Sequence, residues 1–450
     1  MADDRFRDSS ASSSAAPGAS AEDAADVIVA GAGVIGLAVA WELRRAGARV
    51  TLVDPEPASG ASNAAAGMLA PAGEVQFQHD RLVPLMTASA AEYPEFIARL
   101  EAVAGSGSAG YRAAETLHCG ADAADREALA RRAALQEALG LGIERIAPRQ
   151  ARALEPALSP RLSAALRAPG DRQTDPRRLC RALLDALAAD DDALPGPPVR
   201  LLRRRAVRLL RGLRAGAGAG TASERAPGGA PVAGPAALAE PDPVEGVELD
   251  DGTRLRAAET VLAAGADSGE LEGLPGTLPL RPVHGDIVRT AALGPGERPL
   301  LERTVRALVH GEQVYLVPRE DGSLVIGATT REDRQEKPLL GGVSRLLLNA
   351  QAVVPGVAEL SIAEVSAGRR PGTPDDLPLI GRLGQARGLV VCTGHSRHGV
   401  LLAPLSARLA AALALEGLRP MPLSEADRAA LAVTDPGRFG DHSEPGGHNA

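Results

Sequence analysis

The sequence has little cysteine, few aromatic residues and no long apolar run. Its three cysteines among 450 residues lie far apart without CxxC spacing, which excludes a disulfide scaffold or a zinc site and fits a reducing cytoplasm. Aromatic residues make up 2%, so the core must consist mainly of Leu, Val and Ala. No apolar run reaches the roughly 18 residues of a membrane helix, and residues 1–20 lack the apolar segment of a signal peptide. We therefore expect a cytoplasmic protein with no membrane partner.

An excess of positive charge is also missing, as are the motifs of several enzyme classes. The net charge of −8 argues against a nucleic-acid partner. The eight histidines show no HExxH or other ligand spacing, so no metal site is expected. No GxSxG motif is present, which leaves a serine hydrolase without support. With 45% hydrophobic and 24% charged residues, the composition is that of a globular protein.

The length is enough for two or three domains, and the hydrophobic pattern divides the chain into strands and helices. Residues 1–23, rich in Ser, Ala and Asp, are expected to be disordered. Residues 212–243 are dominated by Ala, Gly and Pro and predict a flexible insertion, and residues 421–450 a polar tail. Helical patterns cover 34–47, 86–104, 121–154, 176–190 (with Asp175 as N-cap), 342–354 and 399–415. Strand patterns cover 26–31, 48–54 and 388–393, and a hairpin turns at Asp251 and Gly252.

Residues 31–36 (GAGVIG) have the spacing GxGxxG and lie between a predicted strand and a predicted helix. Gly31 permits a tight turn, Gly33 lets a pyrophosphate approach the backbone, and Gly36 allows the helix to pack close to the strand. The helix N-terminus presents N–H groups and the positive end of its dipole to the phosphates. Asp54, at the end of the next strand, would accept hydrogen bonds from the adenosine ribose and disfavours NADP. The motif does not distinguish NAD from FAD.

Segments further along the chain do distinguish these cofactors. After the second strand comes a loop of small residues that contains AAAGMLAP, suited to lie against a flat ligand. VYLVPREDGSLVIGAT, AGRRPGTPDDLPLIG and TGHSRHGVLLAP follow in that order. Together with the glycine motif, these segments resemble the D-amino-acid oxidase superfamily of FAD enzymes, most closely its glycine oxidase branch, over residues 26–420. An NAD dehydrogenase would not need the last segment.

The resemblance implies an α/β fold with two domains. One is a Rossmann-type FAD-binding domain, and the second is an α+β substrate domain built on an antiparallel sheet. The FAD-binding domain would take residues 24–100, 172–270 and 364–420, and the substrate domain residues 101–171 and 271–363. Since members of the family often form tetramers, the resemblance implies that this chain forms a homo-oligomer.

The resemblance also assigns roles to single side chains. Arg370 matches the arginine that grips the substrate carboxylate, which a planar guanidinium can do with two parallel hydrogen bonds. Tyr315 matches the tyrosine whose hydroxyl assists there, and Arg397 matches a second active-site arginine. The substrate pocket would also contain Met68, Glu74 and Thr330.

FAD is implied to bind without a covalent bond. No cysteine stands just before the TPD segment, where sarcosine oxidases of the superfamily attach FAD, and Cys392 lies in a predicted strand. The helix that begins near residue 398 would point its positive end at the flavin pyrimidine ring and stabilise reduced flavin. The residues implied at the cofactor are Gly31, Gly33, Val34, Ile35, Gly36, Asp54, Ser62, Ala66, Gly67, Met68, Val207, Ala264, Gly265, Gly394, Arg397, His398, Gly399, Val400 and Leu401.

Several positions depart from the family pattern. Arg369 replaces a common leucine, Ser396 an aromatic residue and His398 an asparagine. Residues 284–286 (HGD) stand where the family usually has a basic residue, glycine, and then Gln or Glu. Thr330 replaces a pocket methionine, and Glu74 falls where the family has an acid on a mobile entrance loop. These positions bear on substrate choice and rate rather than on the fold.

The implied reaction is oxidative deamination of glycine or a similarly small amino acid. Arg370 and Tyr315 would hold the carboxylate while a hydride passes from the neutral-amine substrate to flavin N5. Dioxygen would reoxidise the flavin and yield hydrogen peroxide, and the imine would serve thiazole synthesis in thiamine biosynthesis. Two alternatives remain open. One is a flavin dehydrogenase of sarcosine or a D-amino acid that uses another acceptor, and the other is a non-catalytic flavin-binding protein.

Overall fold

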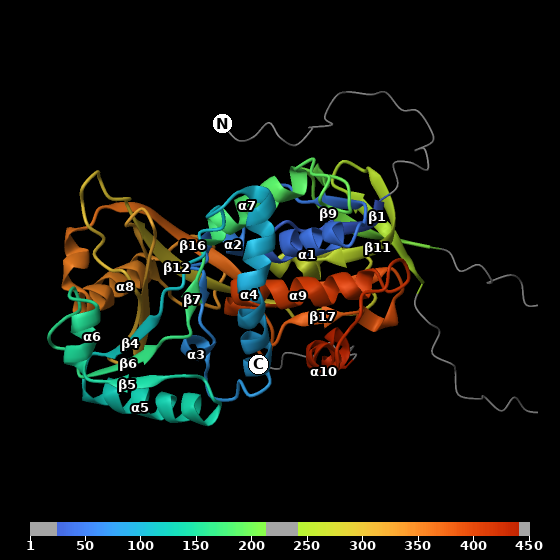
Figure 1. Ribbon diagram of the computed structural model, residues 1–450. Helices are drawn as coiled ribbons and strands as arrows, with labels where there is room; N and C mark the ends of the chain where they lie inside the picture. Colours follow the sequence, from blue (N-terminus) through green and yellow to red (C-terminus); the bar gives the residue numbers. More distant parts are fainter. Residues whose placement is uncertain (1–24, 213–241, 441–450) are drawn as a thin grey trace, which may run out of the picture.

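The computed structural model describes residues 25–212 and 242–440, which form two eight-stranded sheets flanked by helices (Figure 1). The predicted disordered segment at 1–23, most of the insertion predicted at 212–243 and the end of the predicted tail lie outside the described residues. None of the described helices combines the length and the apolar composition that a bilayer-crossing helix requires.

The first sheet is parallel through its centre, as the strand–helix–strand pattern predicts. Its strands run in the order β17 (Leu379–Gly381), β18 (Leu389–Thr393), β11 (Arg254–Leu262), β1 (Ala25–Ala30), β2 (Val50–Val53) and β8 (Arg200–Leu202). From β18 to β8 each pair is parallel, and β17 is antiparallel to β18. A hairpin of β9 (Ala206–Arg211) and β10 (Val244–Leu249) adds to β11, and the predicted turn at Asp251 and Gly252 joins β10 to β11.

Both faces of this sheet are covered, which explains the unbroken apolar run in β1. Val27 and Val29 pack against a layer of helices, whereas Ile28 and Ala30 pack on the opposite face beside β9 and β10. The helix layer consists of α1 (Val34–Arg45), α4 (Leu82–Ala104), α7 (Pro176–Ala188) and α9 (Gly399–Ala414). In Figure 1, α4 crosses in front of α1 and α9.

The second sheet runs in the order β16 (Ile362–Gly372), β12 (Arg281–Thr290), β15 (Leu324–Gly327), β14 (Glu312–Pro318), β13 (Thr304–Val309), β4 (Thr116–Gly120), β6 (Ala164–Ala168) and β5 (Glu144–Ile146). Its pairs are antiparallel apart from β13 with β4. Helix α8 (Leu340–Val353) covers one face, where Leu316 of β14 and Leu346 pack together. Tyr315 and Val317 of β14 therefore point to the other face.

Two sequence predictions need correction. Residues 121–154 do not form one helix. Helix α5 (Ala123–Ala138) ends before Gly140, which adopts a φ of +69° that does not continue a helix. Strand β5 follows, and then α6 (Pro148–Leu154). The predicted tail contains α10 (Glu425–Thr434), which Ser424 caps by accepting from the Asp427 N–H at 3.1 Å. Strand β16 pairs with β12 along its length, on both sides of residue 364. The domain division itself stays a prediction.

Four short elements lie between the two sheets. They are α2 (Ala61–Ala64), β3 (Met68–Leu69), α3 (Pro71–Glu74) and β7 (Arg172–Gln173). Strands β3 and β7 pair with each other as a separate two-stranded sheet.

Candidate active site

A cavity of about 1420 Å³ lies where the parallel strands of the first sheet end, and it reaches across to the second sheet. Gly31 follows β1, Asp54 follows β2 and Ala263 follows β11, and all three line it. Tyr315 of β14 and Arg370 of β16 line it from the second sheet. Ligands of α/β folds bind beyond the carboxyl ends of parallel strands, so this cavity is the candidate active site.

The GxGxxG turn has the backbone geometry that its glycines predict. Gly31 adopts a φ of +106°, and a Cβ there would collide with the backbone of Ala263. A Cβ on Gly36 would collide with the Gly31 carbonyl, because α1 packs closely on the turn. The nearest atom to a Cβ added at Gly33 is Ser62 Oγ, 3.3 Å away, so here the backbone is open toward the cavity. The turn leaves room for a phosphate group at the start of α1.

The Asp54 carboxylate braces this turn from the end of β2. One oxygen accepts from the N–H of Ala32 at 2.7 Å, and the other accepts from the N–H of Glu56 at 2.8 Å. Each carboxylate oxygen can accept a further hydrogen bond, so the half-buried Asp54 can still bind a ribose hydroxyl. Ser62 accepts from the Val34 N–H at 2.9 Å and so ties α2 to the first turn of α1.

A second helix begins at the cavity. Helix α9 starts at Gly399, and residues 395–401 line the cavity. Burial lowers the pKa of His398, which precedes the helix, to about 4, although the Glu74 carboxylate opposes this shift. His398 is therefore neutral at neutral pH and adds no charge to the positive end of the α9 dipole.

Most residues expected at the cofactor come together here. Gly36 and Gly394 lie outside the lining: Gly36 serves the packing of α1, and Gly394, with φ +74°, turns the chain between β18 and α9. The expected residues that do line the cavity are Gly31, Gly33, Val34, Ile35, Asp54, Ser62, Ala66, Gly67, Met68, Val207, Ala264, Gly265, Arg397, His398, Gly399, Val400 and Leu401.

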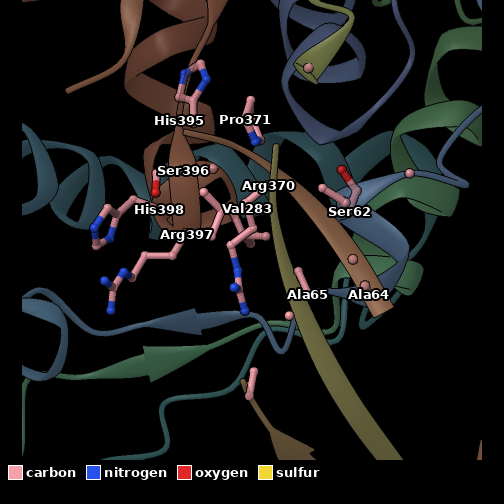
Figure 2. A pocket seen from close by; sticks show the side chains of 18 of the residues that line it. Ser62, Ala64, Ala65, Val283, Arg370, Pro371, His395, Ser396, Arg397 and His398 are labelled. Atoms are coloured by element: carbon pink, nitrogen blue, oxygen red, sulfur yellow. The ribbon is translucent and has the colours of Figure 1, made fainter. Parts of the chain in front are cut away.

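Two glycines make room for the side chains expected to bind the carboxylate. The Arg370 guanidinium lies where a Cβ of Gly285 would be, and the Tyr315 ring lies over Gly327 in the same way. Burial raises the pKa of the Tyr315 hydroxyl above its usual value, although the charge of Arg370 opposes the rise, so the phenol stays a hydrogen-bond donor. In Figure 2 the side chains of Arg370 and Arg397 extend toward the same side of the pocket.

Arg397 and Thr330 lie at the edge of the cavity. Arg397 is exposed, and the Gln76 amide, oriented with its oxygen toward Arg397, accepts two hydrogen bonds from it at 2.8 and 3.1 Å. Thr330 is also exposed. Met68 is half-buried, and its sulfur lies 3.3 Å from a guanidinium nitrogen of Arg306. These three expected residues therefore share the cavity with Arg370.

The expected setting of Glu74 on an entrance loop is wrong. Glu74 ends the short helix α3, is buried, and forms an ion pair with Arg306 of β13. Burial opposes its ionisation, but the charge of Arg306, with smaller contributions from His398 and Arg397, lowers the pKa of Glu74 to about 2. The pair is held together because each charge would be costly to bury without the other.

Arg306 is the main site residue that the sequence reasoning missed. All six residues of β13 (TVRALV) are buried, and an arginine in an apolar strand needs a partner or a ligand. That isolated charge was the available signal. Its partner Glu74 is 232 residues earlier in the chain, which no local pattern reveals.

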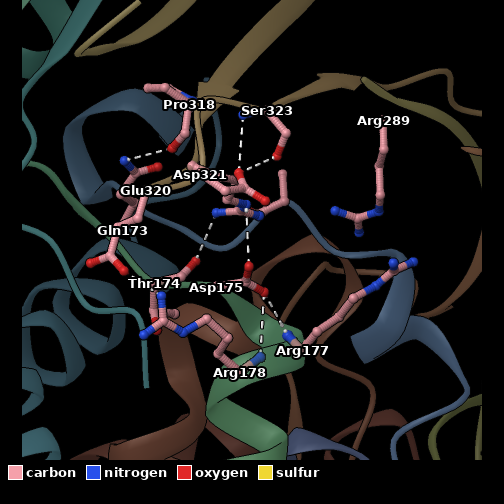
Figure 3. A network of polar contacts seen from close by, with 12 residues as sticks. Gln173, Thr174, Asp175, Arg177, Arg178, Arg289, Pro318, Glu320, Asp321 and Ser323 are labelled. Carbon is pink, nitrogen blue, oxygen red and sulfur yellow. Dashed lines mark hydrogen bonds and ion pairs between the residues drawn. The ribbon is translucent and has the colours of Figure 1, made fainter. Parts of the chain in front are cut away.

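Three arginines hold the loop of small residues against the cavity wall. Arg319 donates to the Ala66 carbonyl at 2.7 Å, and Arg289 donates to the carbonyls of residues 63–65 at 2.8 to 3.3 Å. Arg177 donates to the carbonyl of residue 63 at 3.0 Å. Figure 3 shows Arg177 and Arg289 side by side within this network. The loop therefore has a fixed backbone on which a flat ligand could lie.

Asp175 anchors the same network at the start of α7. As predicted, it caps the helix, accepting from the N–H of Arg177 at 2.9 Å and of Arg178 at 3.4 Å (Figure 3).

Three of the positions that depart from the family pattern form ion pairs or backbone hydrogen bonds. Arg369 forms an ion pair with Asp267, which lies in the short helix Gly265–Glu270 that follows β11. His284 exchanges two backbone hydrogen bonds with Arg331, at 2.7 and 2.9 Å. Arg331 also forms an ion pair with the buried Asp286 at 2.8 Å. Within residues 25–212 and 242–440, no group of three His, Cys, Asp or Glu side chains is arranged to hold a metal ion.

Comparison with known proteins gives consistent relatives. A family model described as "DAO: FAD dependent oxidoreductase" matches residues 26–413. The chain is 30% identical over 393 residues to the bifunctional protein ThiO/ThiG of Trichormus variabilis, covering 87% of this chain and 53% of that protein. It is 30% identical over 400 residues to a glycine oxidase of Geobacillus kaustophilus, covering 86% of this chain and 92% of that protein.

The fold agrees with these sequence relatives. The crystal structure of glycine oxidase from Geobacillus kaustophilus matches with a TM-score of 0.73 and 28% identity, covering 91% of this chain and 98% of that one. The chain spans about half the length of the ThiO/ThiG proteins that it matches. On its family match, its fold and its cofactor cavity, the chain belongs to the DAO family of FAD-dependent oxidoreductases.

Proposed function

We propose that this enzyme oxidatively deaminates glycine or a similarly small amino acid, using dioxygen as the acceptor. The observation that carries the proposal is the position of Arg370 and Tyr315. Both project from the second sheet into the cavity whose other wall is the GxGxxG turn, so a carboxylate held there lies beside the cofactor. The names of the relatives, glycine oxidase and ThiO/ThiG, support the same substrate.

The described residues fit a non-covalently bound FAD. The space beside Gly33 and the N-terminus of α1 suit the pyrophosphate, and Asp54 suits the ribose. The N-terminus of α9 suits the flavin ring. Cys392 is fully buried in β18, and burial raises the pKa of its thiol well above the usual value, so it stays an unreactive thiol. When bound, FAD supplies the two-electron acceptor for the Cα hydride.

Arg370 fixes the substrate, because its planar guanidinium can donate two parallel hydrogen bonds to the carboxylate. Burial lowers the pKa of Arg370 from its usual value, and Tyr315 partly offsets this shift. A guanidinium stays protonated in proteins, so the group remains a cation at neutral pH. Tyr315 adds one O–H donor. Holding the carboxylate in this way orients the Cα–H toward the cofactor, and the hydrogen bonds replace the water around the carboxylate and the guanidinium. The substrate amine enters in its neutral form, so the step uses no protein base.

The biological setting belongs to the same proposal. The imine product would serve thiazole synthesis in thiamine biosynthesis, as the name ThiO/ThiG of three relatives suggests. The low cysteine content supports a cytoplasmic location, and the family resemblance supports a homo-oligomer such as a tetramer.

The test is a stoichiometry measured on the purified holoenzyme with glycine in air. We expect one glyoxylate, one ammonia and one hydrogen peroxide for each dioxygen consumed, and a large loss of turnover in Arg370→Ala. Glycine turnover without peroxide would mean that another acceptor takes the electrons, as in a flavin dehydrogenase. Unchanged turnover in Arg370→Ala would contradict the assignment of the carboxylate site.

A further inference from the structure

The cavity carries more positive charge than a glycine carboxylate can use. Across the second sheet, Tyr315 of β14 pairs with Arg306 of β13, which in turn pairs with His118 of β4. Direct partners on adjacent strands project their side chains to the same face. All three side chains line the cavity, in a row that leads away from Arg370.

Arg306 is already neutralised within this row. Its ion pair with Glu74 is buried on both sides, with 9% of each side chain exposed. The next cation, Arg132 of α5, also lines the cavity but forms no hydrogen bond and no ion pair within the described residues. Burial, together with the charge of Arg306, lowers the pKa of Arg132 to about 10, so it remains charged at neutral pH.

His118 lies beside these two arginines and also lacks a partner. It is 1% exposed, and neither ring nitrogen has a hydrogen-bond partner in the described part of the chain. A Cβ added at Gly73 would lie 3.2 Å from the His118 ring and 3.3 Å from the Arg306 side chain, so both side chains pack against that glycine. Burial lowers the pKa of His118 well below its usual value, so the ring is neutral and offers one N–H donor.

We propose that Arg132 and His118 form a second anion-binding subsite, through which the enzyme also binds amino acids that carry a second acidic group. An unpaired guanidinium and an unsatisfied imidazole N–H at one end of a cavity are the groups that bind a carboxylate. His118 and Tyr315 are two strands apart, roughly 10 Å between backbones. A molecule with one acidic group at Arg370 and another at Arg132 can bridge that row. Glu74 does not neutralise Arg132, because its carboxylate forms an ion pair with Arg306.

This inference deepens the proposed function and rests on it, so its first test is a binding measurement that needs no turnover. Glutarate and butyrate, which differ by one carboxylate, are titrated into the holoenzyme by calorimetry. We expect glutarate to bind at least about ten-fold more tightly, the usual effect of one charged hydrogen bond. Equal affinities would overturn the proposal.

Variants assign the effect to Arg132. In Arg132→Gln the preference for glutarate should fall to about two-fold or less, and Arg132→Lys should restore part of it because the charge is kept. Arg131→Gln is the matched control. Arg131 is next along α5, its side chain is 65% exposed, and the preference should stay as in the parent. A preference that survives in Arg132→Gln with unchanged thermal stability would place the second anion elsewhere.

Turnover measurements then distinguish a failure of the anion subsite from a failure of the proposed function. N-(carboxymethyl)glycine is compared with N-ethylglycine, and D-glutamate with D-norvaline, with glycine as reference. We expect kcat/KM to be about ten-fold higher for at least one acidic member of a pair, and this ratio to fall in Arg132→Gln. Glycine oxidation with no preference for either acidic compound would overturn the subsite alone. A flavin that no amine reduces, in an enzyme that still prefers glutarate, would overturn the proposed function and keep the subsite.

Discussion

The Arg370 guanidinium occupies the space that a side chain at Gly285 would need. Gly285 lies on β12, and its neighbour β16 carries Arg370, so the two strands share one cavity-facing surface. In Gly285→Ala the new methyl group would push the guanidinium away from the carboxylate site. Because a displacement of about 1 Å can cost 100-fold in rate, we expect kcat/KM for glycine to fall by about that factor.

The measurement is steady-state kinetics with the flavin content of each variant checked by absorbance. Gly341→Ala serves as control, because an added Cβ at this position in α8 meets no atom within 4 Å. Its kinetics should match those of the parent enzyme. Unchanged kcat/KM in Gly285→Ala would show that the position of Arg370 is not set by this contact.

Arg319 links the loop of small residues to the second sheet. It is 9% exposed and donates to the carbonyls of Ala66 and Thr174 at 2.7 and 3.2 Å. Arg319→Met would leave both buried carbonyls without a donor, and we expect the free energy of unfolding to fall by about 2–4 kcal/mol. Urea denaturation measures this change. Arg254→Met removes an exposed ion pair at 3.0 Å and should cost less than about 0.5 kcal/mol.

Asp171 gives the protein a distinctive pH dependence. Its side chain is buried, one carboxylate oxygen lacks a partner, and burial raises its pKa to about 7 from 3.8, although Thr116 and Arg306 oppose the rise. Above about pH 4 the unfolded chain releases this proton while the folded protein keeps it until about pH 7. The folded state binds more protons in that interval, so the contribution of Asp171 to stability is lost as the pH rises.

Asp171→Asn cannot release a proton and removes this loss. We expect the variant to gain roughly 3 kcal/mol relative to the parent between pH 5 and pH 8, as seen in urea denaturation at each pH. The side chain of Glu127 is 73% exposed on α5, so the stability of Glu127→Gln should depend on pH as that of the parent does. Parallel curves for Asp171→Asn as well would mean that Asp171 is ionised throughout this range in the folded protein.

Asp54 serves both the glycine turn and the expected ribose. Asp54→Asn keeps one acceptor for the Ala32 or Glu56 N–H but weakens the acceptor for a ribose hydroxyl. We expect the dissociation constant for FAD to rise about ten-fold, the effect of losing one charged hydrogen bond. Titration of the apoprotein with FAD, followed by flavin fluorescence, checks this. Glu127→Gln should bind FAD like the parent, since its side chain is 73% exposed on α5 and lies outside the cavity lining.

The parts of the site that depend on local patterns were predictable from the sequence. The turn at Gly31, the acid at Asp54 and the start of α9 near Gly399 each follow from a few adjacent residues, because backbone geometry and helix ends are local properties. Ser424 and Asp427 also form a local capping signal, and α10 was missed although that signal was present.

The buried charged pairs could not be predicted from short sequence patterns. Glu74 and Arg306 are distant in sequence, and so are Arg177 and Glu364, whose two hydrogen bonds measure 2.8 and 2.9 Å. Such pairs depend on how the sheets stack, which hydrophobic periodicity does not specify. The same holds for Arg132, which looks like one more charge on an exposed helix until the fold places it at the cavity.

The visible spectrum of the purified protein, recorded before and after glycine is added without oxygen, decides whether this is a glycine-reducible flavoenzyme. We expect flavin bands that bleach with glycine and return when air is admitted, and bands that persist in Arg370→Ala. Flavin bands that glycine leaves unchanged in the parent enzyme would contradict glycine as the substrate. Protein that shows no flavin bands after incubation with FAD would contradict the cofactor site itself.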